Sequence, residues 1–256
     1  MIPQLISLLV LLSAVFAAPK DSSSRIVNGT DARIEDYPFM ISLRSKSGRH
    51  SCGGSILNEH WILTAAHCVD YYNTVFYQSV QVGRTDINEN VDDSVYLIDD
   101  VVIHPHYDEV NSFVNDVALI RLKKPLEFNN VIKPVTLPKK WYEVSESDLK
   151  VTLIGWGMNA TGGSISTTLQ KVDYFITLND GCNDIHDRHI FPSQICAATP
   201  GGGKGQCSGD SGGPLLHNGV QVGIVSWSVK PCTVAPYPGV LTKVSYFLDF
   251  IDENIY

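Results

Sequence analysis

The sequence is short of charge, and the charge that it carries is mainly negative. Of its 256 residues only 18% are charged, and 19 basic residues stand against 27 acidic ones, which gives a formal net charge of −8. Binding to the phosphate backbone of a nucleic acid requires a basic surface, so we expect no nucleic-acid partner. With 44% hydrophobic residues, the chain can bury a sizeable core and is not expected to be disordered.

Long apolar runs are lacking except at the N-terminus. Residues 1–17 are apolar almost throughout, but this run is too short to cross a bilayer comfortably. Small residues at Ala17 and Ala18 offer a cleavage site, so residues 1–17 are predicted to be a secretory signal peptide, although the usual Lys or Arg at its start is missing. The alternative, a permanent membrane anchor, is disfavoured by the length. We expect a secreted, extracellular protein that does not contact a membrane.

Internal repeats, low-complexity segments and C-x-x-C pairs are lacking too. The six cysteines of a secreted chain predict three disulfides, and the sequence alone leaves fifteen pairings open. The lack of a C-x-x-C pair argues against a structural zinc site.

What the sequence does contain is a series of short apolar segments separated by Gly, Pro, Asn and Asp. This pattern is typical of an all-β sandwich or barrel. One amphipathic helix is expected near the end, over residues 246–254. The expected strands are 40–43, 61–64, 80–82, 97–103, 118–122, 151–154, 172–176, 221–226 and 240–243.

Ser211 lies at the centre of the Gly-rich stretch QCSGDSGGP, residues 206–214. A serine hydroxyl is a weak nucleophile, so chemistry here needs a base and donors that stabilise developing negative charge. The backbone N–H groups of Gly209 and Ser211 could be those donors. Asp210, in an otherwise neutral turn, calls for a buried cationic partner. Alone, the motif also fits a Gly-rich surface turn that happens to contain a serine.

His67 and Asp116 are the candidate partners of Ser211. His67 ends an apolar segment in LTAAHC, and Asp116 begins another in NDVALI. His67 could accept the proton of the Ser211 hydroxyl, while Asp116 holds the imidazole in the right tautomer. Each of them alone fits a structural histidine or a strand-capping aspartate better. Their order along the chain with Ser211 favours the catalytic interpretation.

Arg25 precedes Ile26 in the stretch RIVNG. An exposed arginine before two β-branched residues is a good site for a trypsin-type protease. Cleavage would leave Ile26 with a charged amine on an apolar residue, and Asp210 is the candidate carboxylate to receive it. Residues 18–25 are then an activation propeptide, and the chain is a zymogen. The alternative is an unprocessed linker followed by a strand.

The blocks IVNG, TAAHC, NDVAL and GDSGGP together resemble the trypsin/chymotrypsin family of serine proteases. The resemblance implies an all-β peptidase domain over residues 26–256. Two packed antiparallel six-stranded β-barrels would cover residues 26–130 and 131–245, followed by a C-terminal helix over 246–254. The function that this implies is a secreted serine endopeptidase.

The resemblance also assigns the site residues. His67, Asp116 and Ser211 would be catalytic, with an acyl-enzyme forming on Ser211, and the N–H groups of Gly209 and Ser211 would form the oxyanion hole. His50 matches the residue that holds the Asp210 region before activation. After cleavage at Arg25, the Ile26 amine would pair with Asp210 and order the oxyanion hole. The implied disulfides are Cys52–Cys68, Cys182–Cys196 and Cys207–Cys232.

The primary specificity pocket is where the sequence departs from the best-known members of the family. Gly205 stands where trypsin has an aspartate, so a buried substrate Arg or Lys would have no counter-ion. Gln206 is expected to project into the pocket and make it shallower and more polar. Ser228 narrows the mouth slightly, and Leu241 returns some space at the back. The expected substrate-binding residues are Gly205, Gln206, Ser226, Trp227, Ser228 and Gly239.

We therefore predict cleavage after uncharged residues, aromatic or aliphatic, with aromatic or Leu-sized side chains first. Ser226 and Trp227 would begin the strand that pairs with the substrate backbone. The alternative is an acidic residue before the scissile bond, attracted by Lys204 and Lys230, although exposed lysines are usually only solvated.

The remaining motifs are weaker. The loop over residues 83–94 matches a region that binds calcium in some relatives, but Arg84 and Ser94 occupy its key acidic ends, and its acids are Asp86, Glu89, Asp92 and Asp93. His186 and His189 have helical ligand spacing in a polar stretch, which is a weak pattern. We predict no metal and no cofactor.

Two sequons are present, at Asn28 and Asn159. Asn159 is the expected glycosylation site because it lies in a predicted loop. A glycan on Asn28 would obstruct docking of the new terminus, so none is expected there.

Two functions fit the sequence. The first is an active, monomeric endopeptidase that acts on proteins or peptides, is activated by a trypsin-like protease and is blocked by protein protease inhibitors. The alternative is a catalytically weak homologue that serves as a binding or regulatory protein. Such proteins usually lose a catalytic residue or an oxyanion glycine, and His67, Asp116, Ser211 and Gly209 are all present.

Overall fold

The computed structural model describes residues 26–70, 79–88, 92–140, 142–144 and 146–255. The predicted signal peptide and propeptide lie outside the described residues, as does Glu89. None of the helices in the described part of the chain is both long enough and apolar enough to span a membrane.

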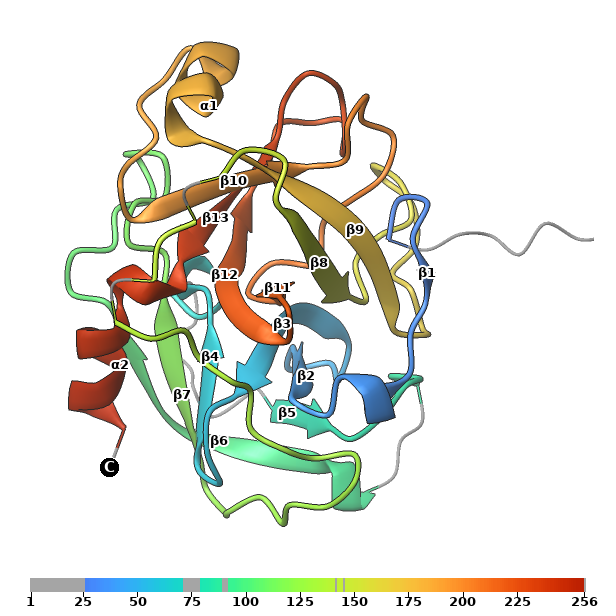
Figure 1. Ribbon diagram of the computed structural model, residues 1–256. Coiled ribbons are helices and arrows are strands. Elements are labelled where there is room, and N and C mark those ends of the chain that lie inside the picture. Colours follow the sequence, from blue (N-terminus) through green and yellow to red (C-terminus); the bar gives the residue numbers. More distant parts are fainter. Residues whose placement is uncertain (1–25, 71–78, 89–91, 141, 145, 256) are drawn as a thin grey trace, which may run out of the picture.

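The first half of the chain forms a closed antiparallel barrel of six strands in the order β2-β3-β4-β7-β6-β5. These strands lie in the lower half of Figure 1. Trp61 and the apolar residues of the inner face are buried together in one core cluster. The strands are β2 (Met40–Arg44), β3 (His50–Ile56), β4 (Trp61–Thr64), β5 (Ser79–Val82), β6 (Val95–Ile103) and β7 (Ala118–Leu122).

The second half forms a second barrel, in which β8 pairs with both β9 and β11 and so closes the ring β8-β9-β10-β13-β12-β11. The short β1 (Thr30–Asp31) adds to the edge of β9. The two-barrel, all-β architecture predicted from the resemblance is therefore confirmed. The ring strands are β8 (Lys150–Gly155), β9 (Gln170–Thr177), β10 (Gln194–Ala198), β11 (Pro214–His217), β12 (Val220–Trp227) and β13 (Gly239–Lys243).

Alternation of buried and outward residues explains why such segments form barrel strands. In β9, Val172, Tyr174 and Ile176 are buried, while Lys171 and Asp173 between them face outward. Successive side chains of a strand point to opposite faces, so this sequence places one apolar face in the core. The buried residues of β9 join a second core cluster, to which Ile26 also belongs.

Helices are few and short. The C-terminal helix α2 (Leu248–Asn254) follows a 3-10 turn, η5 (Val244–Tyr246), and buries Leu248 and Ile251 against the core of the first barrel. The helix α1 (Asn179–His186) was not expected from the sequence. The other 3-10 turns in the described part of the chain are η1 (Ile34–Asp36), η2 (Ala66–Cys68) and η4 (Asp92–Ser94).

Four strands were also missed by the sequence patterns, namely β1, β3, β10 and β11. In β3, Gly53 and Gly54 lower the intrinsic preference for a strand. Both glycines are packed too closely for a side chain, because a Cβ on Gly54 would lie 2.9 Å from the Leu63 carbonyl oxygen and one on Gly53 would lie 3.0 Å from Gly213 Cα. The same glycines that hide the strand from sequence analysis thus allow its close packing.

Three disulfides are present, Cys52–Cys68, Cys182–Cys196 and Cys207–Cys232. These are the pairings that the resemblance implies.

Candidate active site

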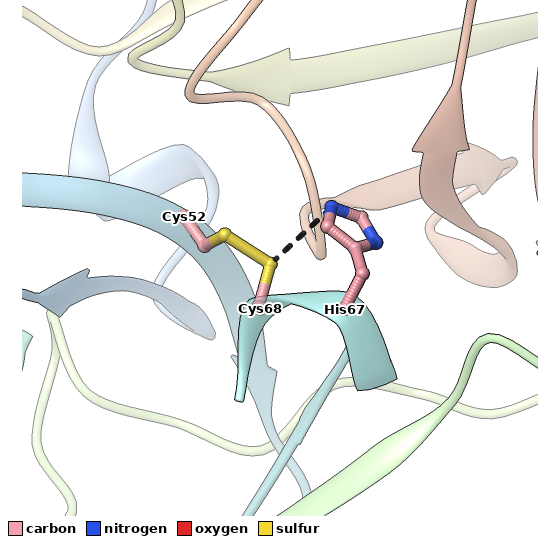
Figure 2. A group of neighbouring side chains, drawn as sticks. All are labelled: Cys52, His67 and Cys68. Atoms are coloured by element: carbon pink, nitrogen blue, oxygen red, sulfur yellow. Dashed lines mark hydrogen bonds between the residues drawn. A yellow bond between two sulfur atoms is a disulfide. The ribbon is translucent and has the colours of Figure 1, made fainter. Parts of the chain in front are cut away.

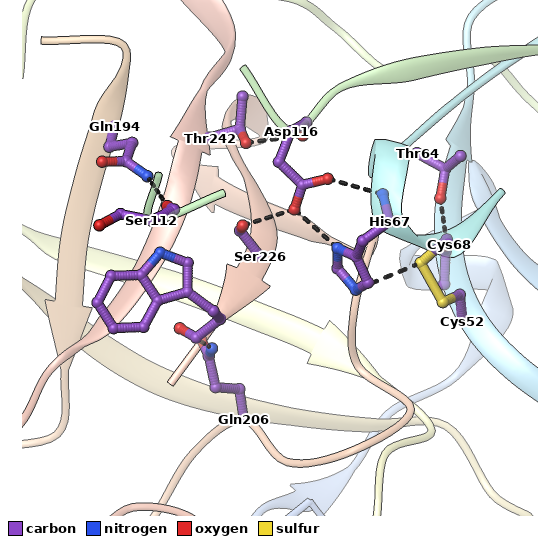
Figure 3. Close-up of polar contacts among 12 residues, drawn as sticks. Cys52, Thr64, His67, Cys68, Ser112, Asp116, Gln194, Gln206, Ser226 and Thr242 are labelled. Atoms are coloured by element: carbon purple, nitrogen blue, oxygen red, sulfur yellow. Dashed lines mark hydrogen bonds and ion pairs between the residues drawn. A yellow bond between two sulfur atoms is a disulfide. The ribbon is translucent and has the colours of Figure 1, made fainter. Parts of the chain in front are cut away.

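His67 and Asp116 meet because their flanking strands are paired. His67 lies in η2, immediately after β4, and Asp116 lies two residues before β7. Thr64 of β4 is opposite Ala118 of β7, so the residues just beyond these two positions reach the same end of the barrel. There His67 Nδ1 lies 2.7 Å from Asp116 Oδ2, and the His67 backbone N–H donates to Oδ1 at 2.9 Å (Figure 3).

Asp116 is fully buried and well supplied with donors. Besides the two bonds from His67, its Oδ2 accepts a hydrogen bond of 2.6 Å from the hydroxyl of Ser226, which belongs to β12 of the second barrel. Its backbone carbonyl accepts a further bond, at 2.7 Å, from Thr242. A buried carboxylate needs such partners, and here they come from both barrels. The His67–Asp116 pair therefore lies at the junction of the two barrels.

Ser211 lies in the turn that leads into β11, and its backbone carbonyl accepts a 2.8 Å hydrogen bond from Gly53 N–H of the first barrel. In the described part of the chain, the Ser211 hydroxyl makes no hydrogen bond. The Nε2 atom of His67 lies 3.8 Å from Cys68 Sγ (Figure 2). Catalytic hydrogen bonds between nucleophile and base are often formed only when substrate is bound.

The backbone N–H groups of Gly209 and Ser211 have no acceptor among the described residues. Gly209 has a φ of 97°, which a residue with a side chain rarely adopts, and a Cβ here would lie 2.6 Å from Ile165 Cδ1. A glycine is thus required at this position. Two unpaired N–H groups beside a serine form a suitable site for an oxyanion.

His50 fixes the orientation of the peptide that follows Gly209. Its Nε2 lies 2.8 Å from the Gly209 carbonyl oxygen, and its Nδ1 lies 2.8 Å from the Ser42 hydroxyl. Because a carbonyl only accepts, Nε2 carries the proton, and Nδ1 then accepts from Ser42. Burial, against the effect of the Gly209 hydrogen bond and with a smaller contribution from the nearby Arg44 charge, lowers the pKa of His50 to about 4. The imidazole is therefore neutral at neutral pH.

Asp210 is fully buried beside these groups. Its carboxylate accepts hydrogen bonds from Gly157 N–H at 2.8 Å and from Cys207 N–H at 2.9 Å. Burial raises the pKa of Asp210 to about 7, and the two N–H donors and the charge of Lys230 offset the rise only in part. The Asp210 carboxylate thus forms no ion pair with a described residue, which is what we expect of a carboxylate that binds a cation only at a later stage.

Ile26 is fully buried in the core cluster of the second barrel. Tyr174 belongs to the same cluster, and burial, with a smaller contribution from the charge of Asp210, raises the pKa of the Tyr174 hydroxyl. Ile26 has a φ of 50°. This left-handed conformation is a strained one for a β-branched residue.

Three of the expected pocket residues, Trp227, Ser228 and Gly239, lie around the side chain of Gln206. Gln206 Nε2 donates to the Trp227 carbonyl at 3.1 Å (Figure 3), and its backbone N–H donates to the Tyr174 hydroxyl at 2.7 Å. A cavity of about 20 Å³ remains there, lined in part by Gln206, Ser228 and Gly239. Gly205 leaves no carboxylate at this position, and a Cβ there would lie 2.0 Å from the Tyr174 oxygen.

One cluster of metal-type ligands occurs in the described part of the chain, made of Cys52, His67 and Cys68. The two sulfurs form a disulfide (Figure 2), so they are not the thiolates that bind metals. His186 and His189 have separate partners. His186 Nε2 lies 2.9 Å from the Pro238 carbonyl, and His189 packs edge-on against Phe191.

The loop over residues 83–94 contains an ion pair between Arg84 and Asp93 at 2.9 Å. Asn28 donates from its side-chain amide to the Gly203 carbonyl at 2.8 Å, so that amide is engaged in the fold. Asn159 is half-buried, and its side-chain oxygen accepts from Ser164 N–H at 3.3 Å.

Several residues of the site were missed by sequence reasoning. Ser42 holds His50, Gly157 donates to Asp210, and Phe113 packs edge-on against the His67 ring with 5.8 Å between the ring centroids. Gly157 is required because a Cβ there would lie 2.1 Å from Asp210 Oδ2. The glycines in GWG, residues 155–157, are a possible signal, but Ser42 and Phe113 stand in no distinctive pattern.

The double barrel, the buried His–Asp pair and the serine beside unpaired N–H groups define the class of protein as a serine hydrolase with two β-barrels. Comparison with known proteins identifies the family. The Trypsin family model matches residues 26–251. The chain belongs to this family and is a serine endopeptidase.

The chain is similar both to relatives named as trypsins and to relatives named as chymotrypsins. The chain is 37% identical to Trypsin-1 of Astacus astacus over 242 residues, which cover 90% of this chain and 99% of the relative. It is 38% identical to Chymotrypsin-2 of Vespa crabro over 229 residues, which again cover 90% of this chain and 99% of the relative. The vitellin-degrading protease of Bombyx mori is 36% identical over 233 residues, which cover 90% of this chain and 86% of the relative. Overall similarity therefore does not decide the specificity.

Proposed function

We propose that the chain is a secreted serine endopeptidase that is made as a zymogen and activated by cleavage after Arg25. The active enzyme hydrolyses peptide bonds through an acyl-enzyme on Ser211. The observation that carries this proposal is the buried Asp116, which binds His67 through two hydrogen bonds, together with the unpaired backbone N–H groups of Gly209 and Ser211. The proposed natural substrates are proteins or peptides.

In the first half of the reaction, Ser211 Oγ attacks the carbonyl carbon of the scissile bond and gives its proton to His67 Nε2. The carbonyl oxygen becomes an oxyanion, which the N–H groups of Gly209 and Ser211 stabilise. The C–N bond then breaks, and His67 gives its proton to the leaving amine. Ser211 is left as an ester of the acyl group.

In the second half, water replaces the amine. His67 takes a proton from the water as its oxygen attacks the ester carbon, and the proton returns to Ser211 Oγ when the C–O bond breaks. Asp116 stays ionised throughout, holds Nδ1–H of His67 and stabilises the imidazolium. The 2.6 Å hydrogen bond from Ser226 keeps the carboxylate in place.

Activation acts through Ile26 and Asp210. Cutting the Arg25–Ile26 bond creates a free amine at Ile26. It also removes the peptide carbonyl before Ile26, and steric contacts of such a carbonyl are the reason why a φ of 50° is disfavoured for a residue with a side chain. The new cation pairs with the buried Asp210 carboxylate, whose raised pKa marks the lack of such a partner. Because Asp210 lies between Gly209 and Ser211, the ion pair fixes the oxyanion hole.

The pocket residues support cleavage after uncharged side chains. Gly205 offers no carboxylate to a substrate Arg or Lys, and Gln206 adds polarity without charge. The other proposed partners are a trypsin-like activating protease and protein protease inhibitors, and the enzyme acts as a monomer. Asn159 is the proposed glycosylation site.

The test is hydrolysis of a peptide library by the purified protein before and after cutting with trypsin, which is then removed with a trypsin inhibitor. N-terminal sequencing should show Ile26 at the new terminus, and activity should appear only after the cut. Ser211→Ala should be cut but inactive, and Arg25→Gln should remain uncut and inactive, which also controls for residual trypsin. Correctly cut protein that hydrolyses no peptide would refute the proposal in favour of a binding function.

A further inference from the structure

Gln206 contains a buried acceptor that has no partner. The residue is only 3% exposed, and each of its nitrogen atoms donates one hydrogen bond, the backbone N–H to the Tyr174 hydroxyl and Nε2 to the Trp227 carbonyl. In the described part of the chain, Oε1 is buried without a hydrogen bond. A buried acceptor that is left unpaired has lost its water without compensation. Such an atom in a pocket points to a ligand that brings a donor.

The orientation of the Gln206 amide follows from its surroundings. The Trp227 carbonyl only accepts, so the NH₂ group must face it and Oε1 must face the other way. On that other side stands Gly239, where a Cβ would lie 2.4 Å from Oε1. The side chain thus lies between Trp227 and Gly239, two of the expected pocket residues.

The remaining space is small. The cavity that Gln206 lines with Ser228 and Gly239 has a volume of about 20 Å³. A single water molecule needs roughly 10–15 Å³ by this kind of measure, so the cavity holds one group about the size of a hydroxyl or methyl. An aromatic or Leu-sized side chain would have to displace Gln206 and break its bond to Trp227.

We propose that Gln206 forms the floor of the primary pocket and selects substrates with a small side chain that carries a hydrogen-bond donor, serine first, before the scissile bond. A serine hydroxyl fits the space and donates to Oε1 once the amide turns this buried atom towards the cavity, whereas alanine fits but leaves Oε1 unpaired. Leucine and phenylalanine do not fit. This inference rests on the proposed function, and it replaces the preference for aromatic or Leu-sized residues that the sequence suggests.

The experiment measures kcat/KM of the cleaved enzyme on peptides that differ only in the residue before the scissile bond: Ser, Ala, Leu, Phe, Arg or Glu. Rates are divided by the concentration of active sites, titrated with a serine-directed phosphonylating reagent. We expect kcat/KM for the Ser peptide to exceed that for the Ala peptide about tenfold, which is the discrimination that one hydrogen bond to a buried acceptor gives. Ala should exceed Leu and Phe by a similar factor. A higher rate after Phe or Leu than after Ser overturns the inference.

Two variants separate the hydrogen bond from the size limit. Gln206→Met keeps the length of the side chain without an amide oxygen, so it should abolish the Ser-over-Ala ratio and keep small side chains ahead of large ones. Gln206→Ala enlarges the pocket, so it should raise kcat/KM for the Leu and Phe peptides about tenfold relative to the Ala peptide. A Ser-over-Ala ratio that survives in Gln206→Met overturns the role of Oε1.

Lys204→Gln tests the alternative of an acidic specificity, because Lys204 lines the same cavity without a hydrogen bond to Gln206. It should leave all the ratios unchanged. Efficient cleavage after Glu in the natural enzyme that is lost in Lys204→Gln would overturn the inference in favour of an acidic specificity. Failure of the proposed function is recognised separately, since protein correctly cut at Arg25 would then titrate no active sites.

Discussion

The backbone N–H of Gly53, in β3 of the first barrel, donates a 2.8 Å hydrogen bond to the carbonyl oxygen of Ser211 in the second barrel. The candidate nucleophile is thus tied by its own backbone to the barrel that supplies His67 and Asp116. This contact is possible because Gly53 has no side chain, since a Cβ there would lie 3.0 Å from Gly213 Cα and 3.2 Å from Gly213 N. The two halves of the site are held in register by backbone as well as by side chains.

Gly53→Ala should therefore push the Ser211 turn away from the first barrel. We expect a loss of about 1–3 kcal/mol in the free energy of unfolding, as is usual for overpacking, and a fall in kcat of tenfold or more because sub-ångström placement is lost. Urea unfolding and peptide hydrolysis measure the two effects. Gly181→Ala is the control, because the nearest atom to its Cβ is Thr177 Cγ2 at 3.8 Å. Equal effects of the two substitutions would contradict the argument.

His50→Ala should impair catalysis without removing any proposed catalytic group. The variant loses the hydrogen bond that orients the Gly209 carbonyl, and with it the direction of the N–H groups on either side. We expect kcat to fall about ten- to a hundredfold, the lower part of the range for an impaired oxyanion hole, with little change in KM. Ser42→Ala should have a smaller effect in the same direction, because it loosens His50 only. An unchanged kcat in His50→Ala would show that the Gly209 peptide is held by other contacts.

Sequence patterns were sufficient where the local sequence and the fold agree. The segments 61–64 and 118–122 are mainly apolar, and the strands β4 and β7 have these same bounds. The candidate catalytic residues could be named because His67, Asp116 and Ser211 each lie in a distinctive block of sequence. The family resemblance of these blocks also predicted the two-barrel fold.

Features that depend on contacts between distant segments were not predictable in the same way. The strand β3 contains glycines because Gly53 packs against Gly213 and Gly54 packs against Leu63, so its own sequence does not favour a strand. Ser42 acts through His50, eight residues away, and has no pattern around it. The sequence placed Gln206 in the pocket, but the unpaired oxygen depends on the position of the Trp227 carbonyl, which only the folded structure shows.

Ser226→Ala tests the link between Asp116 and the second barrel. The variant removes a 2.6 Å hydrogen bond from a carboxylate that is fully buried. Hydrogen bonds to charged groups contribute about 1.5–3 kcal/mol, so we expect kcat to fall by about tenfold or more as Asp116 and His67 lose their fixed geometry. Thr242→Val is the matched control, because its hydroxyl binds the backbone carbonyl of Asp116 and not the carboxylate. It should lower the stability but have the smaller effect on kcat, and the reverse order would refute the proposed role of Ser226.

The pH dependence of stability tests the state of Asp210 in the uncleaved chain. The pKa of Asp210 is about 7 in the folded protein, above the ordinary value of 3.8. Between these values the folded chain retains a proton that the unfolded chain has released, so this group lowers the free energy of unfolding as the pH rises from about 4 to 7. His50 acts in the opposite sense, because its folded pKa of about 4 lies below 6.5. The contribution of Asp210 must therefore be isolated by comparison with Asp210→Asn.

Asp210→Asn has no carboxylate to ionise at this position, so its stability relative to the natural uncleaved chain should rise from pH 4 to pH 7. The expected change is on the order of a few kcal/mol, since one pKa unit corresponds to about 1.4 kcal/mol. Cleavage after Arg25 should have the opposite effect, stabilising the natural chain at neutral pH because the Ile26 amine neutralises the carboxylate, and leaving Asp210→Asn without this gain. Urea unfolding at several pH values, before and after cleavage, measures each quantity. A relative stability that does not change with pH would mean that Asp210 already has a cationic partner before the chain is cut, and the activation mechanism proposed for Ile26 would then be wrong.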